Sequence, residues 1–342
     1  MTAIDDAQLP ARIARYLQQE TGRVIVVESL VRFPVGFSWL TYAVDLRGLD
    51  DSDTRREFIL RLGPDYGLYA PYSAQPQVLA MQSLHGSAVP VPRAYWHSDD
   101  SRWLGAPFLF CERVRGSAVL PWASASLAPM ADDLRIALAT QFIASLAAMH
   151  SVDWTTQAMR QMANGATRDN TAEQQLTHWQ AQYQRCASRP YPLAEWGLHW
   201  LREHRPQAPA LTIVHGDYRT GNFLEQDGKI TAILDWELTH IGDPHDDLGW
   251  ASLPMYMGGT KLVCRLIESE RFFELYQQQV PFTVSMASVQ YYRVLSLFKL
   301  AATHMAAAHC FERGSFNDMR MPAMGSQVMP VLRQMEKAIE AA

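Results

Sequence analysis

The alternation of apolar and polar positions predicts a β-rich beginning of the chain. Residues 57–62 place Phe58, Leu60 and Leu62 on one face of a strand and Arg61 on the other. Further strands are expected at residues 23–30, 39–46, 93–97 and 107–114, and helices at residues 7–20 and from Pro76 onward. This pattern is typical of a small lobe with a five-stranded sheet and one or two helices.

After Gly116 the apolar spacing becomes helical. Helices are expected at residues 136–150, 174–186 and 192–203, and over most of 255–340 apart from a break at 314–322. One β-like island, residues 211–236, lies between them. We therefore predict an α+β chain with a β-rich N-lobe (residues 1–113) and a larger, mainly helical C-lobe (residues 114–342).

Composition narrows the classes of function. The 342 residues are 48% apolar, and 30 Lys and Arg against 35 Asp and Glu give a net charge of −5. Without a basic block, binding to nucleic acid or to an anionic membrane surface is not expected. The longest apolar stretch, residues 287–311, includes charged side chains that would be costly in lipid, which favours a buried helix.

The cysteines and the first residues indicate a cytoplasmic protein. The four cysteines are scattered and form no CxxC pair, which is typical of a reducing compartment. Residues 1–10 contain two aspartates and no apolar stretch, unlike a signal peptide.

The densest group of polar residues lies between residues 213 and 250. His215 and Asp217 are followed by Asn222, and an apolar strand ends at Asp235. An Asp-Gly pair at residues 227–228 predicts a hairpin turn that brings Asn222 close to Asp235. Amide and carboxylate oxygens suit Mg²⁺, and an Asp on a loop can accept a proton from a hydroxyl group. Together these parts favour phosphoryl transfer from a nucleotide.

Three motifs in order carry a resemblance to a family. They are His215-Gly216-Asp217 with Asn222, Asp235-Trp236-Glu237, and Gly242-Asp243-Pro244 with Asp247-Leu248. This series resembles the aminoglycoside phosphotransferase and choline kinase superfamily, and looks most like the kinase-like domains fused to acyl-CoA dehydrogenases. The resemblance implies a bilobal protein-kinase-like fold, ATP and Mg²⁺ as cofactors, and a small-molecule hydroxyl acceptor.

The resemblance also implies roles for individual residues of the C-lobe. Asp217 would be the catalytic base, or would orient the acceptor hydroxyl. Asn222 and Asp235 would hold Mg²⁺ against the phosphates. His215 would brace the catalytic loop, and Asp247 would bind the backbone of that loop from the start of the following helix.

In the N-lobe the sequence departs from the family pattern. The loop at residues 33–39, which would cover the phosphates, keeps one glycine, Gly36, and Ser38 could meet phosphate beside it. Glu112 and Val114 lie at the expected hinge and would contact the nucleotide.

The resemblance implies a phosphate-binding Lys on the third strand, and Arg61 stands in its place. Its usual Glu partner is replaced by Gln77, with Gln75 as the other candidate. Arginine is a permanent bidentate phosphate ligand, but an amide partner offers one hydrogen bond and no charge pairing.

Two other functions stay open. The amide partner and the glycine-poor loop would also suit a nucleotide-binding pseudokinase. His240 and His245, with Asp243, Asp246 and Asp247, would suit a metal-dependent hydrolase.

The acceptor side of the C-lobe is not an acidic trap for a polycation, because residues 251–342 contain seven acidic and nine basic residues. We therefore favour a less cationic hydroxylated acceptor, such as a hydroxyacyl thioester, over an aminoglycoside-like compound.

Overall fold

The computed structural model describes residues 6–33, 36, 38–64, 67–119, 130–314 and 318–342. The chain divides into two compact units. The small unit comprises Met1–Gln82 and Pro92–Val114, and the large unit comprises Ser83–Val91 and Arg115–Ala342. The predicted boundary at residue 113 lies one residue from this division. The prediction was incomplete for residues 83–91, which group with the large unit although they precede the last two strands of the sheet.

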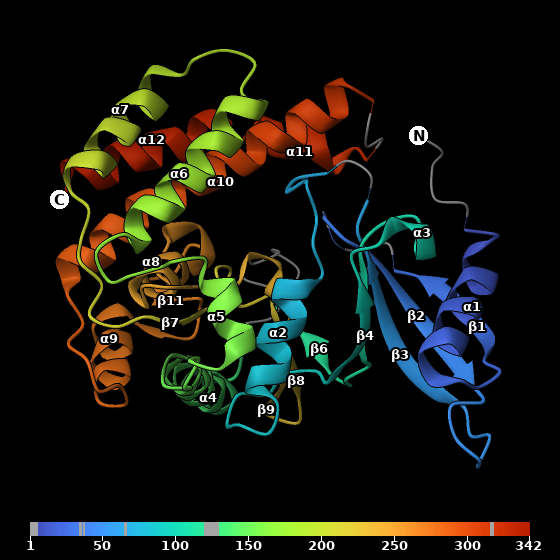
Figure 1. Cartoon of the computed structure of the whole chain (residues 1–342). Helices are drawn as coiled ribbons and strands as arrows, with labels where there is room; N and C mark the ends of the chain where they lie inside the picture. Colours follow the sequence, from blue (N-terminus) through green and yellow to red (C-terminus); the bar gives the residue numbers. More distant parts are fainter. Residues whose placement is uncertain (1–5, 34–35, 37, 65–66, 120–129, 315–317) are drawn as a thin grey trace. The chain divides into compact units, whose positions relative to one another are not determined.

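The small unit is built on a five-stranded antiparallel sheet with the strand order β1-β2-β3-β5-β4 (Figure 1). Its strands are β1 (Val26–Arg32), β2 (Leu40–Arg47), β3 (Arg56–Leu62), β4 (Ala94–Ser98) and β5 (Phe108–Glu112). Its helices are α1 (Leu9–Thr21), α2 (Gln75–Leu84), which runs on into the large unit, and α3 (Ser101–Leu104). All five strands predicted from the alternation are present.

The two faces of β3 are used differently. Phe58, Leu60 and Leu62 are buried in a core that also includes Leu9 and Ile13 of α1. Because successive side chains of a strand point to opposite faces, Arg61 faces away from this core, toward α2. The alternation therefore places one cation on the face of the sheet opposite α1.

The large unit is mainly helical. Its helices are α4 (Asp132–His150), α5 (Gln157–Ala163), α6 (Thr171–Cys186), α7 (Pro192–Glu203), α8 (His245–Ala251), α9 (Ser269–Gln277), α10 (Met286–Glu312), α11 (Arg320–Gly325) and α12 (Val328–Glu340). The long helix α10 packs against α6, α8, α11 and α12 (Figure 1). The predicted helix 192–203 matches α7 at both ends. The break predicted at 314–322 was too long at its end, because α11 begins at Arg320.

Short strands interrupt these helices and position the polar residues. They are β6 (Ser117–Ala118), β7 (Thr212–Val214), β8 (Phe223–Gln226), β9 (Lys229–Ile233), β10 (His240–Gly242), β11 (Leu262–Val263) and β12 (Ile267–Glu268). They form the sheets β6-β8-β9, β10-β7 and β11-β12. The expectation of helix over most of 255–340 is confirmed by α9, α10, α11 and α12. The strands β11 and β12 were not predicted, because strands of two residues are too short to produce an alternating pattern.

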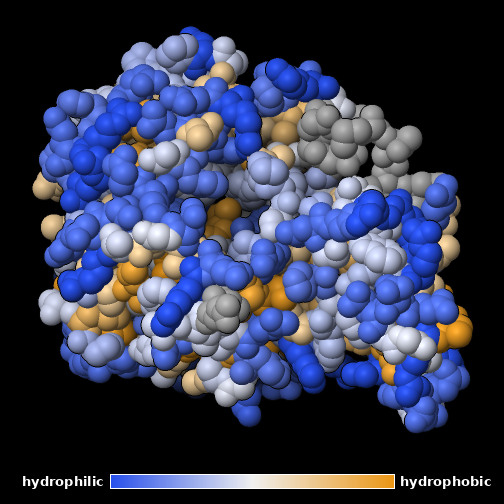
Figure 2. Space-filling model, viewed as in Figure 1, coloured by the Kyte–Doolittle hydropathy of each residue, from blue (hydrophilic) through white to orange (hydrophobic). Residues whose placement is uncertain are grey.

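The apolar helix α10 is a core helix. By length and composition alone it could cross a membrane, but 83% of its most apolar window is buried inside the protein. Hydrophilic residues predominate on the face shown in Figure 2. The expectation of a buried helix at residues 287–311 is confirmed.

Candidate active site

The site is centred on the loop between β7 and β8, residues 215–222, which we call the catalytic loop. Gly216, the second residue of this loop, has a φ of 81°, in the left-handed region that favours glycine. A Cβ atom on Gly216 would lie 2.5 Å from the carbonyl oxygen of Leu238, so a side chain has no room there. The loop can therefore turn tightly against the segment that follows Asp235.

Asp247, in the first turn of α8, holds the start of the catalytic loop. Its Oδ2 accepts from the N–H of His215 and its Oδ1 from the N–H of Gly216, both at 2.8 Å. Burial alone would raise the pKa of Asp247, but these donors and His150 hold it below its ordinary value. The predicted contact with the loop backbone is present.

A buried chain of side chains supports Asp247 from behind. Nε2 of His150, at the end of α4, lies 3.1 Å from Asp247 Oδ2, and its Nδ1 lies 2.6 Å from the Tyr276 hydroxyl. Because an ionised carboxylate only accepts hydrogen bonds, we assign the Nε2 proton to His150 and the Nδ1–Tyr276 proton to the phenol. Burial raises the pKa of Tyr276 well above its ordinary value, which keeps this donor protonated.

His215 joins the catalytic loop to the segment after β9 that carries Asp235. Its Nδ1 accepts from the N–H of Asp217 at 3.2 Å, and its Nε2 donates to the carbonyl oxygen of Leu234 at 2.9 Å. These partners fix one neutral tautomer, and burial lowers the pKa of His215, which favours that form. The geometry is that of a brace, as the sequence predicted.

Asp217 is surrounded by donors. Arg219 Nε lies 2.8 Å from Asp217 Oδ1 and Arg219 Nη2 lies 3.2 Å from Oδ2. Trp250 Nε1 donates to Oδ1 and Asn222 Nδ2 to Oδ2, both at 2.6 Å. The four bonds fix the direction of the carboxylate within the loop.

Asn222 and Asp235 lie at adjoining ends of the predicted hairpin. The backbone N–H of Leu234 donates to the carbonyl oxygen of Asn222 at 2.7 Å, and Asp235 is the next residue. Asp235 has a φ of 68°, an uncommon conformation for a residue other than glycine and one found at functional sites. Asn222 Nδ2 donates to Asp217, so its Oδ1 is the atom suited to a cation. This oxygen and the Asp235 carboxylate fit Mg²⁺ by donor type.

The hairpin itself forms as its sequence predicts. Asp227 and Gly228 have φ values of 52° and 77°, as a two-residue type I′ turn requires. Gln226 pairs with Lys229 across the turn, and Phe223 pairs with Ile233 at the other end. This register determines that the residues before β8 and after β9 meet.

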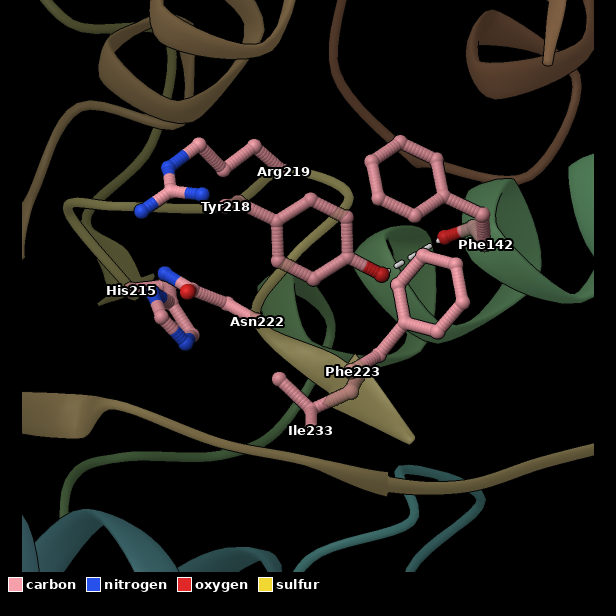
Figure 3. Close-up of a pocket in the computed structure, with 7 residues that line it drawn as sticks. All are labelled: Phe142, His215, Tyr218, Arg219, Asn222, Phe223 and Ile233. Atoms are coloured by element: carbon pink, nitrogen blue, oxygen red, sulfur yellow. Dashed lines mark hydrogen bonds between the residues drawn. The ribbon is translucent and has the colours of Figure 1, made fainter. Parts of the chain in front are cut away.

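A tight pocket lies under the catalytic loop (Figure 3). Its lining residues are Phe142, His215, Tyr218, Arg219, Asn222, Phe223 and Ile233. The Tyr218 hydroxyl crosses it to donate to the carbonyl oxygen of Phe142 at 2.7 Å (Figure 3). The pocket is too small for a substrate and is part of the packing that supports the loop.

The residues considered for a hydrolase site pair with separate partners. His245 Nδ1 donates to Asp243 Oδ1 at 2.6 Å, and its Nε2 accepts from the N–H of Ser285. His240 Nε2 lies 3.5 Å from Asp246 Oδ2. Within the described ranges of the chain, no three or more His, Cys, Asp or Glu side chains are grouped as metal ligands. The arrangement gives the hydrolase hypothesis no support.

The small unit holds its own candidate residues. Arg61 Nη1 donates to Oε1 of Gln77 at 3.0 Å, and its guanidinium lies 5.7 Å from the centre of the Trp39 ring. Gln77 is 1% exposed, whereas Gln75 is exposed, so the structure identifies which glutamine meets Arg61. The predicted contact between Arg61 and an amide is present.

The other predicted nucleotide-binding residues of the small unit are placed less completely. Gly36 is exposed with a φ of 99°, and Ser38 is buried, whereas Pro34, Val35 and Phe37 of the same loop lie outside the described residues. Glu112 ends β5, and its carboxylate accepts from the N–H of Arg93 at 3.2 Å. Val114 is the last residue of the small unit. Their roles with a nucleotide stay predictions.

A protein-family model that matches most of the chain shows which family the chain belongs to. The model of the phosphotransferase enzyme family matches residues 29–274, which include every motif described above. The chain belongs to the phosphotransferase enzyme family. The resemblance inferred from the three motifs is thereby confirmed.

Sequence relatives of this chain include much longer proteins. Mouse acyl-CoA dehydrogenase family member 10 is 28% identical over 289 residues, 80% of this chain and 26% of that protein. Human acyl-CoA dehydrogenase family member 11 is 28% identical over 200 residues, 57% of this chain and 25% of that protein. The chain thus spans about a quarter of the length of these relatives.

Solved structures show the same fold. A protein from Ralstonia eutropha, provisionally described as an aminoglycoside phosphotransferase, matches with a TM-score of 0.70 and 24% identity over 97% of this chain and 98% of its own. A mutant of aminoglycoside phosphotransferase APH(4)-Ia, in a ternary complex with ADP and hygromycin B, matches with a TM-score of 0.56 and 14% identity over 96% and 98%. The kinase-like fold expected from the motifs is confirmed.

Four residues around the catalytic loop were not predicted from the sequence. Arg219 and Trp250 bind Asp217, and His150 binds Asp247. Lys299, 3% exposed on α10, donates to the carbonyl oxygen of Gly216 and lies 4.2 Å from the centre of the Trp250 ring. A lysine within an apolar stretch was the one available signal, because a buried ammonium needs a partner.

Proposed function

We propose that the protein is an ATP-dependent phosphotransferase that moves the γ-phosphoryl group to a hydroxyl group of a small molecule. The observation that carries this proposal is the joining of Asp217, Asn222 and Asp235 by the catalytic loop and the β8–β9 hairpin. These are the parts that phosphoryl transfer needs, because its catalysis is mostly positioning and charge neutralisation. The family membership and the relative in complex with ADP support ATP as the donor.

Each residue of the loop has a part in this proposal. Asp217 orients the acceptor hydroxyl and accepts its proton. Asn222 and Asp235 would hold Mg²⁺, which neutralises charge on the phosphates when it is bound. His215 and Asp247 hold the loop in place and touch no reacting atom.

The small unit would contribute to nucleotide binding. Arg61 supplies a permanent cation with a planar donor geometry suited to phosphate oxygens. We also assign nucleotide contacts to Gly36, Ser38, Glu112 and Val114, on the basis of the family resemblance.

For the acceptor, we propose a hydroxylated acyl thioester in preference to an aminoglycoside. Two cations, Arg219 and Lys299, lie beside the catalytic loop, and Arg219 already pairs with Asp217, so a polycation would have to compete with it for this carboxylate. Residues 251–342 contain seven acidic and nine basic residues, Lys299 among the latter, so this part of the unit is not acidic. The names of the acyl-CoA dehydrogenase relatives support an acyl thioester.

A transfer screen tests both parts of the proposal. Purified protein is incubated with γ-labelled ATP and Mg²⁺ together with hydroxyacyl-CoAs, free hydroxy acids or aminoglycosides, and labelled products are separated. We expect label on hydroxyacyl-CoAs. Transfer to aminoglycosides alone would contradict the acceptor class, and absence of transfer to every acceptor would contradict the enzyme proposal.

A second candidate function is nucleotide binding without efficient catalysis. The neutral Gln77 beside Arg61 favours it, because the charge pairing of the family pattern is absent from that contact. Magnesium-dependent ATP turnover that disappears in Asp217→Ala would exclude this function.

A further inference from the structure

The carboxylate of Asp217 is fully occupied by donors from its own protein. Two oxygens offer about four lone-pair directions. Four N–H groups point at them, two from Arg219, one from Trp250 and one from Asn222. An acceptor hydroxyl, or a water, can donate to this carboxylate only if one of the four bonds breaks.

Two of the three donor residues are fixed. Trp250 is 4% exposed on α8, and Lys299 lies against its ring. Asn222 is 6% exposed and its Nδ2 bonds to both the side chain and the backbone carbonyl of Asp217. Moving either residue would break several contacts at once.

Arg219 is the most exposed of the three donors, and a further hydrogen bond, from its Nη1 to the carbonyl oxygen of Thr220 at 3.1 Å, stays within the same loop. Its long side chain extends from the loop itself, and its guanidinium rests 5.3 Å from the centre of the Tyr256 ring. Burial works to lower the pKa of Arg219, but the charge of Asp217 outweighs it and the pKa is raised, so the group stays a cation. A cation with a side chain only 16% exposed cannot leave Asp217 without another anion to receive it.

We propose that Arg219 occupies the place of the acceptor hydroxyl on Asp217 and gives it up only to an anionic oxygen group that arrives with the substrates. The effect of Arg219 on ATP rests on the proposed function, whereas its hydrogen bonds to Asp217 do not. The receiving anion is a phosphoryl oxygen or a carboxylate of the substrates. Arg219 is thus a specificity-determining residue.

The consequence is protection of ATP from water. In hydrolysis, the oxygen of water forms a bond to the γ-phosphorus, the bridging P–O bond breaks to release ADP, and the proton of water passes to a base. While Arg219 fills Asp217, this carboxylate cannot position water or accept its proton. ATP is then cleaved mainly when an acceptor is present.

The first experiment compares hydrolysis with transfer. Arg219→Gln and Arg219→Met are assayed for ADP release with and without the acceptor identified by the screen, beside wild type. We expect acceptor-independent hydrolysis to rise by about tenfold or more, within the range that a positioned base supplies, while transfer falls. Arg135→Met is the matched control, because Arg135 pairs with Asp132 on α4 and does not contact the site.

A second experiment does not depend on turnover. The Nε–H signal of Arg219 is assigned in the ¹⁵N NMR spectrum by its loss in Arg219→Lys, and inorganic phosphate is titrated into the full chain. We expect a saturable shift with phosphate and none with chloride at equal ionic strength. Sodium acetate in a parallel titration separates a carboxylate from a phosphate as the receiving anion.

The outcomes separate the two proposals. Folded Arg219 variants, verified by unchanged thermal unfolding, whose hydrolysis does not rise would overturn the role of Arg219. An Nε–H signal unmoved by both anions would overturn it as well. If wild type transfers phosphate to no acceptor but the signal moves, the proposed function fails while the displacement of Arg219 stands.

Discussion

The two units hold their candidate catalytic residues in different ways. In the large unit, Asp217 and its loop are joined to α4, α8, α10 and the β8–β9 hairpin by buried hydrogen bonds. In the small unit, the candidate phosphate-binding residue Arg61 forms a hydrogen bond with the neutral amide of Gln77 on α2. The large unit therefore carries a preorganised, charged network, and the small unit a contact that adds no charge pairing.

This difference indicates where the activity is determined. A charged group held by several donors is already oriented for its reaction, whereas the hydrogen bond between Arg61 and the Gln77 amide is of modest energy. We expect substitutions in the loop to affect kcat and stability, and substitutions around Arg61 to affect mainly nucleotide affinity. The predictions below test this comparison from its strongest point to its weakest.

The largest effect is expected at the base. Asp217→Asn keeps the size of the side chain but removes the proton acceptor, so kcat of transfer should fall by about 10²–10⁴-fold. Asp227→Asn is the control, because Asp227 is exposed in the hairpin turn and asparagine tolerates its positive φ. Comparable activity of the two variants would contradict the assignment of Asp217.

The next effect concerns the anchor of the loop. Asp247→Ala leaves two backbone N–H groups and His150 without their buried acceptor, and should lower the free energy of unfolding by about 3–5 kcal/mol in urea titrations. Glu274→Ala, which breaks an exposed pair with Arg271, should cost at most about 1 kcal/mol. Similar costs for the two variants would show that the network around the loop contributes little.

A smaller effect depends on pH. Burial lowers the pKa of His304, on α10, from 6.5 to about 4. Because the pKa of His304 is lowered in the folded protein, the unfolded chain binds a proton on this histidine at a higher pH than the folded chain does. The contribution of the neutral His304 to the free energy of unfolding is therefore complete above pH 6.5 and is lost as the pH falls toward 4. The loss should reach about 3 kcal/mol.

His304→Gln should flatten this part of the stability profile, measured by urea unfolding between pH 7.5 and 4.5. The exposed His199→Gln should leave the profile as it is in wild type. A profile that is equally steep in all three proteins would show that His304 is not the group responsible.

The smallest effect is expected in the small unit. Gln77→Glu puts a negative charge into the contact with Arg61 and should raise kcat/KM for ATP by up to about fivefold, which corresponds to about 1 kcal/mol. Gln75→Glu, two residues away on the exposed side of α2, should change nothing. An equal response of both variants would indicate a general effect of charge and not a contact with Arg61.

The sequence predicted the fold well where a pattern is local. Alternation at residues 57–62 placed Arg61 opposite the core, and the Asp-Gly turn brought Asn222 to Asp235. The resemblance to the family predicted that Asp247 would bind the loop backbone. Each of these predictions depends on short spacings along the chain.

Contacts between distant elements could not be predicted in the same way. Trp250, Lys299 and His150 reach the catalytic loop from α8, α10 and α4, and only tertiary packing brings them there. The strands β11 and β12 were missed because two residues show no period. Residues 83–91 group with the large unit through contacts that no linear pattern records.

The bond between Trp250 and Asp217 also makes the protein its own optical probe. An indole whose N–H points at a carboxylate and whose ring lies 4.2 Å from the Lys299 ammonium emits at a wavelength determined by these two charges. Neutralising or displacing either charge alters the field across the ring. The difference in fluorescence between wild type and Trp250→Phe thus follows the electrical state of the catalytic carboxylate without any added label.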